Sequence, residues 1–213
     1  MNAIILTYRH KIHASVLYSK FSKLGLNVKI VQADDSNVDG YEGMCSRGIC
    51  HGDKRTTAWD LAFKDIACET TWFVEDDVAF TEQALSNLLE ETSDVDVDLI
   101  AKNIRHPEDD LYWSHRKTVC HVDKRMYSFN PLCRCSPNLI SKILEYRNKH
   151  GQFSFHEILL PSLAETRLDL KELKSVSFEQ FRWNDIAIPL MSNDTSFYHP
   201  IKEVSDYVRL SRI

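Results

Sequence analysis

The stretch TWFVEDDVAF, residues 71–80, decides the fold and the chemistry that we expect of this chain. Residues of high strand propensity run from Thr71 to Val74, three carboxylates follow at 75–77, and an apolar segment comes next. This pattern predicts acids at the end of a core strand. Two carboxylates about 4 Å apart repel by roughly 1 kcal/mol in water and about 4 kcal/mol at an effective dielectric constant near 20. The triplet therefore favours a divalent cation such as Mg²⁺ or Mn²⁺, with a solvated acidic turn as the alternative.

The composition indicates one well-buried domain and excludes some partners. Hydrophobic residues make up 43% of the 213 residues, and the formal net charge is -5, so a general nucleic-acid binder is not expected. Residues 1–6 are typical of a first core strand, and no stretch approaches the 18 apolar residues of a membrane span. Free thiols in a reducing compartment are expected, because the sequence shows no export signal. No two cysteines have the Cys-x-x-Cys spacing that is suited to zinc.

The first third of the chain is typical of a βαβ unit. A strand is predicted over 2–8, a helix over 11–24 that closes at Gly25, and a second strand over 27–33. The predicted helix carries an apolar stripe of Val16, Leu17, Phe21 and Leu24. Such a unit implies parallel pairing with a right-handed crossover, and ligands collect at the carboxyl ends of its strands. The polar residues that would share this edge with the acidic triplet are Thr7, Tyr8, Arg9, Asp34 and Asp35.

Lys54 and Arg55 follow a helix cap predicted at Asp53. They fall in the first helical turn, where the helix dipole disfavours cations by some tenths of a kcal/mol. Their position is explained if an anion such as phosphate binds at this helix start. Two solvated surface charges are the alternative.

The second half continues with alternating strands and helices. We expect a helix from Thr81, strands over 98–103 and 126–135, and a helix over 137–150 that starts at the cap Ser136. The polar and aromatic segment 104–124 is typical of a substrate-facing excursion rather than of core.

Two residues of the second half are candidates for chemistry. Glu157 belongs to a His-Glu pair at the start of an apolar helix, where it is either a general base or simply a favourable acid in a first turn. His199 precedes Pro200 and is therefore expected at a strand end, as a structural residue or as a ligand for the cation of the triplet. Asp185 is the reserve candidate for the base.

The order of these parts resembles the nucleotide-sugar glycosyltransferases of the GT-A fold, and the resemblance covers most of the chain. It implies a single α/β domain over 1–213, with a mostly parallel, Rossmann-like nucleotide-sugar half over 1–103 and a mixed-sheet acceptor half over 104–213. The triplet looks like the Glu-Asp-Asp variant of the Asp-x-Asp motif of these enzymes. More narrowly, the chain is similar to N-terminal glycosyltransferase domains of larger chlorovirus proteins that build capsid glycans.

This resemblance implies a function and a set of roles. The chain would transfer a hexose or deoxyhexose from a UDP-sugar to a glycan hydroxyl, with inversion, on a capsid glycoprotein in the host cytoplasm, as one domain of a longer protein. Asp77 and His199 would bind Mn²⁺ or Mg²⁺, and Glu157 would be the general base. The residues expected to bind the nucleotide sugar are Thr7, Tyr8, Arg9, Asp34, Asp35, Lys54, Arg55, Glu75 and Asp76.

Three other functions remain open from the sequence. A nucleotidyltransferase acting on a sugar phosphate can use the same sheet edge and acidic metal site. A non-catalytic carbohydrate-binding module needs neither Arg55 nor the triplet. A metal-dependent nuclease also uses clustered carboxylates, but the negative net charge disfavours it.

Overall fold

The computed structural model describes residues 1–7, 11–32, 58–64, 66–106, 120–151, 153–180, 195–201 and 203–212. The elements, in chain order, are β1 (Asn2–Thr7), α1 (Lys11–Lys23), β2 (Asn27–Gln32), α2 (Ala58–Lys64), β3 (Thr71–Glu75), β4 (Ala79–Phe80), α3 (Glu82–Thr92), β5 (Leu99–Arg105), β6 (Tyr127–Cys135), α4 (Pro137–His150), α5 (His156–Leu163), β7 (Arg167–Asp169), η4 (Leu170–Glu172), β8 (Ser177–Gln180), β9 (Ser196–His199) and α6 (Val204–Arg212). The predicted α/β class is confirmed.

Within the described residues, the main sheet has six strands in the order β2-β1-β3-β6-β5-β7. β1 is parallel to both β2 and β3, and β5 is parallel to β7. β6 runs antiparallel to its neighbours β3 and β5, so the sheet is mixed. The predicted parallel βαβ opening is confirmed, and it brings the carboxyl ends of β1 and β3 together.

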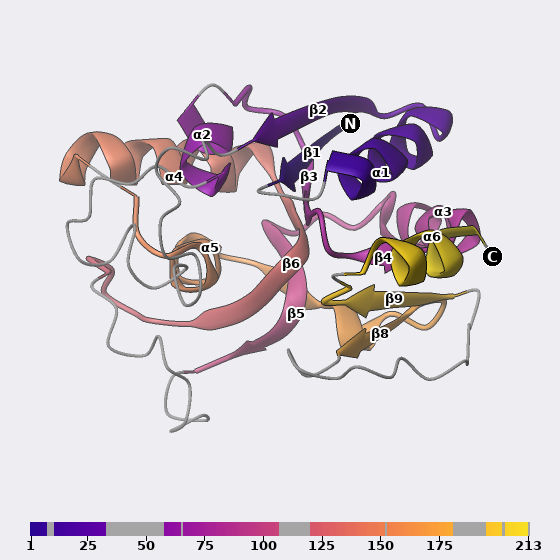
Figure 1. The fold of residues 1–213 in the computed structure, drawn as a ribbon. Helices are drawn as coiled ribbons and strands as arrows, with labels where there is room; N and C mark the ends of the chain where they lie inside the picture. The colour runs from indigo at the N-terminus through magenta and orange to yellow at the C-terminus, as the bar shows by residue number, and fades with distance from the viewer. Residues whose placement is uncertain are drawn as a thin grey trace.

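Helices cover both faces of this sheet, as Figure 1 shows, with α2, α4 and α5 on one side and α1, α3 and α6 on the other. The side chains of β3 alternate between these two layers because successive strand residues point to opposite faces. Phe73 packs with Trp59 of α2 in one core, whereas Trp72 and Val74 pack with Phe21 of α1 in the other. This alternation directs Glu75 to the same face as Phe73.

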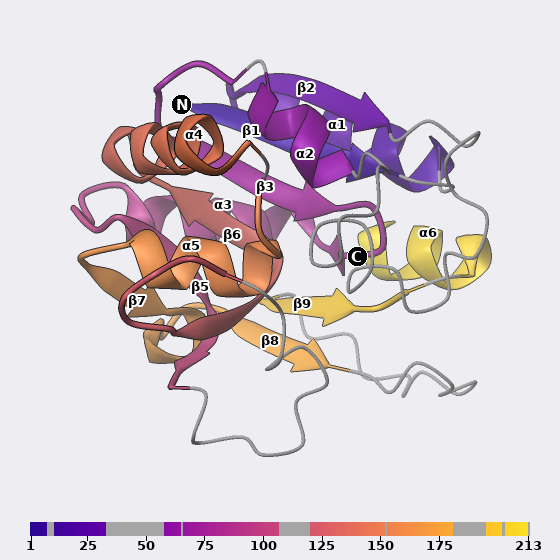
Figure 2. The same ribbon diagram turned by 90° about the vertical axis from the view of Figure 1, so that its left-hand side faces the viewer.

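A smaller sheet joins segments that lie far apart in the sequence, in the strand order β4-β9-β8. β9 pairs antiparallel with β4, with Ala79 opposite Tyr198 and Phe80 opposite Phe197, and it pairs in parallel with β8. Figure 2 shows β9 leading into α6, which also contacts α1 and β4. The C-terminal segment is thereby placed against the residues that follow the acidic triplet.

Local signals set the helix ends as predicted. The Thr81 hydroxyl accepts a hydrogen bond from the backbone N–H of Ala84 at the start of α3, and Ser136 does the same for Leu139 at the start of α4. Gly151 ends α4 with a left-handed φ of 74°. The predicted cap at Asp53 lies outside the described residues.

One predicted core position is wrong. Leu24 was expected in the buried stripe of the first helix, but it is 38% exposed. α1 ends at Lys23, and the backbone N–H of Gly25, with φ of 79°, closes the turn on the carbonyl of Ser22. Leu24 therefore lies in the turn rather than on the inner helix face.

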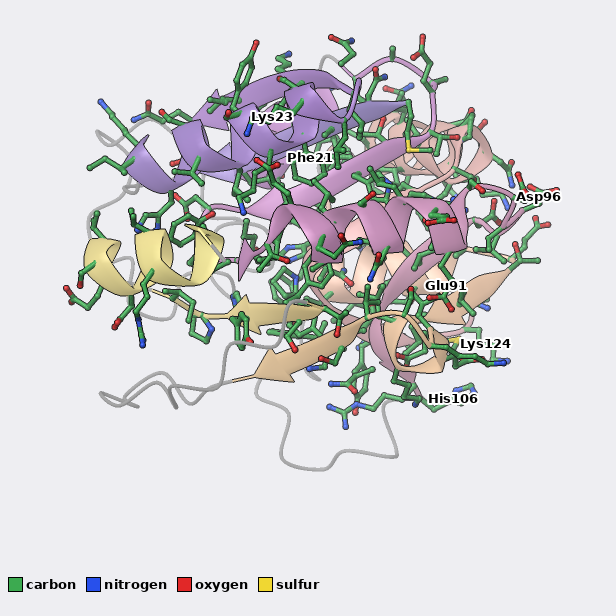
Figure 3. All side chains as sticks on the ribbon, turned by 90° about the vertical axis from the view of Figure 1, so that its right-hand side faces the viewer. Phe21, Lys23, Glu91, Asp96, His106 and Lys124 are labelled. Atoms are coloured by element: carbon green, nitrogen blue, oxygen red, sulfur yellow. The ribbon has the colours of Figure 1, made fainter. Side chains whose placement is uncertain are left out.

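The face that carries α1, α3 and α6 is shown in Figure 3, with Phe21 labelled on α1 and Glu91 on α3. The carboxylate of Glu91 accepts hydrogen bonds of 2.8 Å from the backbone N–H groups of Lys174 and Ser175 and so ties α3 to the segment before β8. None of the helices in the described part of the chain is long and apolar enough to cross a membrane.

Candidate metal and active site

The acidic triplet lies at the carboxyl end of β3, where Glu75 is the last residue of the strand and Asp76 and Asp77 lie in the turn that follows. The backbone N–H of Val78 donates to the carbonyl of Glu75 at 3.1 Å and closes the turn. The N–H of Asp76 donates to the carbonyl of Leu6 on the neighbouring strand β1, and the Thr7 hydroxyl donates to Asp76 Oδ2 at 2.6 Å. Asp76 is thus directed toward β1, as expected for residues that share one sheet edge.

Asp77 and Glu75 converge with His199 from the other end of the chain. His199 Nε2 lies 3.2 Å from Asp77 Oδ1 and 3.7 Å from Glu75 Oε2, and one ligand atom from each residue fits within 4.8 Å of the others. The pairing of β9 with β4 brings His199 here, and the N–H of Ile201 donates to the carbonyl of Asp77 at 2.8 Å. Asp77 and His199 are buried, whereas Glu75 is partly exposed.

The donor set of this group fits a divalent cation. Two carboxylate oxygens and one imidazole nitrogen suit Mn²⁺ and other first-row divalent ions, and purely oxygen-rich sites suit Mg²⁺ better. The carboxylates of Glu75 and Asp77 approach one another in a largely buried turn, so a cation at this position would offset their repulsion. Glu75 was expected to contact the nucleotide sugar, and the structure groups it with the two predicted metal ligands.

The pKa of His199 reflects the same concentration of negative charge. Burial lowers the pKa of this imidazole, but the charge of Asp77 and hydrogen bonding to Asp77 and Glu75 outweigh burial and raise it to about 9. At neutral pH the imidazolium therefore offsets the charge of the two carboxylates. A metal ion at the same position has to displace that proton.

Glu157 lies at the start of α5, beside this group. Burial raises the pKa of its carboxyl group to about 8, and the negative charge of Glu75 acts in the same direction. His199 and the backbone N–H of Asn130, which donates to the carboxyl group, act in the opposite direction. A carboxyl group with a pKa near neutrality can take up and release a proton under ordinary conditions.

Aromatic residues contact the group of Glu75, Asp77 and His199. The indole N–H of Trp59 donates to Glu75 Oε1 at 3.2 Å, and its ring stacks on His156 with centroids 4.2 Å apart. The ring of Phe129 on β6 lies edge-on to His199 at 5.1 Å. Trp59 and His156 join the site without having been predicted as site residues. The only sequence signal for Trp59 is that a buried indole N–H needs an acceptor, which does not identify Glu75.

The structure therefore brings six of the predicted site residues to one edge of the sheet. These are Thr7, Glu75, Asp76, Asp77, Glu157 and His199. The other predicted site residues, Tyr8, Arg9, Asp34, Asp35, Lys54, Arg55 and Asp185, lie outside the described part of the chain.

Comparison with known proteins does not assign the chain to a family. No model of a known protein family matches the chain, and no curated protein is significantly similar to it in sequence. The function therefore has to be inferred from the geometry and the chemistry of the site.

Proposed function

We propose that this chain is a metal-dependent glycosyltransferase of the GT-A type. It would transfer a hexose or deoxyhexose from a UDP-sugar to a hydroxyl group of a glycan, with inversion at the anomeric carbon. The observation that carries this proposal is the grouping of a candidate base, Glu157, with the largely buried cluster of Glu75, Asp77 and His199 at the carboxyl edge of the sheet.

Glu75, Asp77 and His199 are the residues that would hold the cation, Mn²⁺ or Mg²⁺. Bound there, the ion would neutralise the negative charge that develops on the UDP leaving group, which is commonly the largest contribution to catalysis of this kind. The imidazole in the donor set favours Mn²⁺. The pairing of β9 with β4 keeps His199 against Asp77, so this donor set is assembled by the fold itself.

Glu157 is the residue proposed to accept the proton of the acceptor hydroxyl group. The hydroxyl oxygen would attack the anomeric carbon as the bond from that carbon to the diphosphate oxygen breaks, with the electron pair leaving on UDP. The backbone N–H of Asn130 orients the carboxylate, and the pKa of about 8 makes Glu157 a stronger base than an ordinary carboxylate.

Thr7 and Asp76 are proposed to face the nucleoside part of the donor. Their side chains meet at the carboxyl ends of β1 and β3, the edge where ligands bind in sheets of this kind. In the main sheet the parallel strands β2, β1 and β3 lie on one side and the reversed strand β6 follows them. The division into a nucleotide-sugar half over 1–103 and an acceptor half over 104–213 is part of the proposal and comes from the sequence resemblance. A capsid glycan as acceptor is part of the proposal and comes from the sequence resemblance alone.

Thermal unfolding in the presence of nucleotides tests the donor class. UDP and UDP-sugars should raise the melting temperature in the presence of Mn²⁺ and have much less effect in the presence of a chelator, because a ligand stabilises the state it binds. The same panel should contain UTP, GDP-sugars and free glycans. Stabilisation by free glycans alone, without metal or nucleotide, would indicate a carbohydrate-binding module and overturn the proposal.

Product analysis tests the reaction. Incubation with Mn²⁺ and a set of UDP-sugars should release UDP, first slowly by hydrolysis and faster when a suitable glycan acceptor is added. Release of pyrophosphate from UTP and a sugar 1-phosphate would indicate a nucleotidyltransferase instead. The Asp77→Ala variant is the control, since its product release should fall to background.

A further inference from the structure

The side chain of Trp59 makes one polar contact with the candidate metal site. Trp59 belongs to α2 and is 1% exposed, and its indole N–H donates to Glu75 Oε1 at 3.2 Å. An indole N–H can only donate, so the group that it faces has to offer an acceptor oxygen. The contact joins a helix to the end of β3, because Glu75 and Phe73 point to the same face of the strand and Trp59 packs on that face.

The ring of Trp59 is held on several sides. It stacks on Phe73 at 5.2 Å with an interplanar angle of 26°, and on His156 at 4.2 Å with an angle of 12°. Phe63, one turn further along α2, packs against it at 5.7 Å. Rotation of the indole would break these aromatic contacts, so the direction of its N–H is fixed by the core and not by Glu75.

The two oxygens of Glu75 face different groups. Oε1 accepts the hydrogen bond from Trp59, and it lies 4.0 Å from His156 Nε2. Oε2 lies 3.7 Å from His199 Nε2, on the side of the candidate metal ligands. The contact with Trp59 thus holds the carboxylate in the rotation that presents Oε2 to the group of Asp77 and His199.

We propose that Trp59 is a positioning residue for the metal centre, acting through Glu75. This inference rests on the cation site of the proposed function. Hydrogen-bonding partners behind a metal ligand orient it before the ion binds, and their removal typically weakens metal binding by about 10- to 100-fold. Trp59 need not contact the ion or the substrate to have this effect.

The test compares Trp59→Phe with Trp72→Phe. Both changes remove an indole from a fully buried site and leave an aromatic ring. Trp72 lies on β3 itself but packs in the opposite core, and within the described residues its Nε1 has no hydrogen-bond partner. Mn²⁺ alone is titrated into each protein, and free Mn²⁺ is measured by electron paramagnetic resonance. Melting temperatures are recorded with a chelator present.

Trp59→Phe should weaken Mn²⁺ binding by about 10- to 100-fold, whereas Trp72→Phe should change it by less than about threefold at a similar loss of melting temperature. Equal Mn²⁺ affinity of wild type and Trp59→Phe would overturn the proposal. Equal weakening in both variants would also overturn it, because the effect would then follow stability alone.

A second measurement covers the case in which Trp59→Phe does not fold. The four tryptophan indole N–H resonances of the ¹⁵N-labelled wild type are assigned by Trp→Phe changes at 72, 113 and 183, which leaves Trp59. The Trp59 resonance should shift in Glu75→Gln and on addition of Mg²⁺ to the wild type. A Trp59 resonance that responds to neither would overturn the proposal.

These outcomes separate the two proposals of function and positioning. Weaker Mn²⁺ binding in Trp59→Phe, together with no release of UDP from any UDP-sugar by the wild type, would support the role of Trp59 and contradict glycosyl transfer. If the wild type releases UDP normally and Trp59→Phe binds Mn²⁺ as tightly as the wild type, glycosyl transfer would be supported and the role of Trp59 contradicted. A wild type that binds no divalent cation would overturn both.

Discussion

The hydroxyl group of Tyr207 donates a hydrogen bond of 2.9 Å to the carbonyl oxygen of Val78, the residue that directly follows Asp77. Ile201 makes a similar contact one residue earlier, since its backbone N–H donates to the carbonyl of Asp77 at 2.8 Å. The last part of the chain therefore binds two successive peptide groups of the acidic turn and also supplies His199. Burial raises the pKa of Tyr207 well above its ordinary value, so the hydroxyl keeps the proton that it donates.

Tyr207→Phe removes this one donor and should keep the ring in place, because His13 stacks on the ring with centroids 3.8 Å apart. The carbonyl of Val78, which is fully buried, then loses a partner. We expect the free energy of unfolding to fall by about 1–3 kcal/mol, as measured by urea unfolding. The control is Tyr18→Phe at an exposed position of α1, where a change below about 0.5 kcal/mol is expected. Equal losses of unfolding free energy in the two variants would contradict a stabilising role for the hydrogen bond from Tyr207 to Val78.

Glu157→Gln tests the candidate base. The amide keeps the shape of the carboxylate but cannot take up the acceptor proton, so turnover should fall by about 10²- to 10⁴-fold. The metal-dependent affinity for UDP should change little, since the residue is proposed to act on the acceptor side. Initial rates of UDP release and UDP titrations measure the two quantities. The matched control is Glu165→Gln, an exposed residue paired with Lys142, which should retain wild-type rates.

The affinity for Mn²⁺ should rise with pH. The folded-state pKa of His199 is raised to about 9, so at lower pH the imidazole carries a proton that it must release to become a ligand. With one proton displaced, the affinity should increase by up to about tenfold per pH unit below this pKa and level off above it. Mn²⁺ titrations at pH 6.5, 7.5 and 8.5 measure the slope. In His199→Gln the affinity for Mn²⁺ should be lower, and the increase with pH that comes from the His199 proton should vanish. A wild-type Mn²⁺ affinity that does not depend on pH would contradict a role for His199 as a metal ligand.

Much of the framework follows from local patterns in the sequence. The run of strand-forming residues in β3, the caps Thr81 and Ser136, and the glycines at 25 and 151 all act over a few residues, so they can be recognised without the fold. Leu24 shows the limit of this approach. The helical stripe continues to it, but the turn at Gly25 ends the helix one residue earlier.

The site was predictable where residue type limited the choice. Clustered carboxylates after a core strand predicted the position of Asp77, and the Pro after His199 predicted a strand end, as observed in β9. The pairing of β4 with β9 and the contact of Trp59 with Glu75 could not be predicted from the residues alone. Both join segments far apart in the sequence, and they depend on how helices and sheets pack rather than on any local pattern.

Lys20 of α1 is buried against β4 and α6. Its ammonium group donates to the carbonyl oxygens of Phe80 and Ser211 and thereby holds the end of α6 against β4. Burial lowers the pKa of Lys20 from 10.5 to about 8, while Glu82 acts in the opposite direction and Lys23 lowers the pKa further. Between these two pH values the unfolded chain binds a proton that the folded chain has released, so folded-state stability rises with pH. The neutral amine still has two N–H groups for the two carbonyls.

Urea unfolding of wild type and Lys20→Met at several pH values from 7 to 10.5 tests this linkage. The difference in unfolding free energy between the two proteins should be constant below pH 8, because Lys20 is then charged in both the folded and the unfolded state. From pH 8 to 10.5 the wild type should gain up to about 3 kcal/mol relative to the variant, since each unit of pKa difference corresponds to about 1.4 kcal/mol. The other titrating groups are common to both proteins, so their contributions cancel in the difference in unfolding free energy. Parallel stability curves over this range would show that Lys20 titrates as it does in the unfolded chain, and that its two carbonyl contacts stabilise the ammonium group as well as water does.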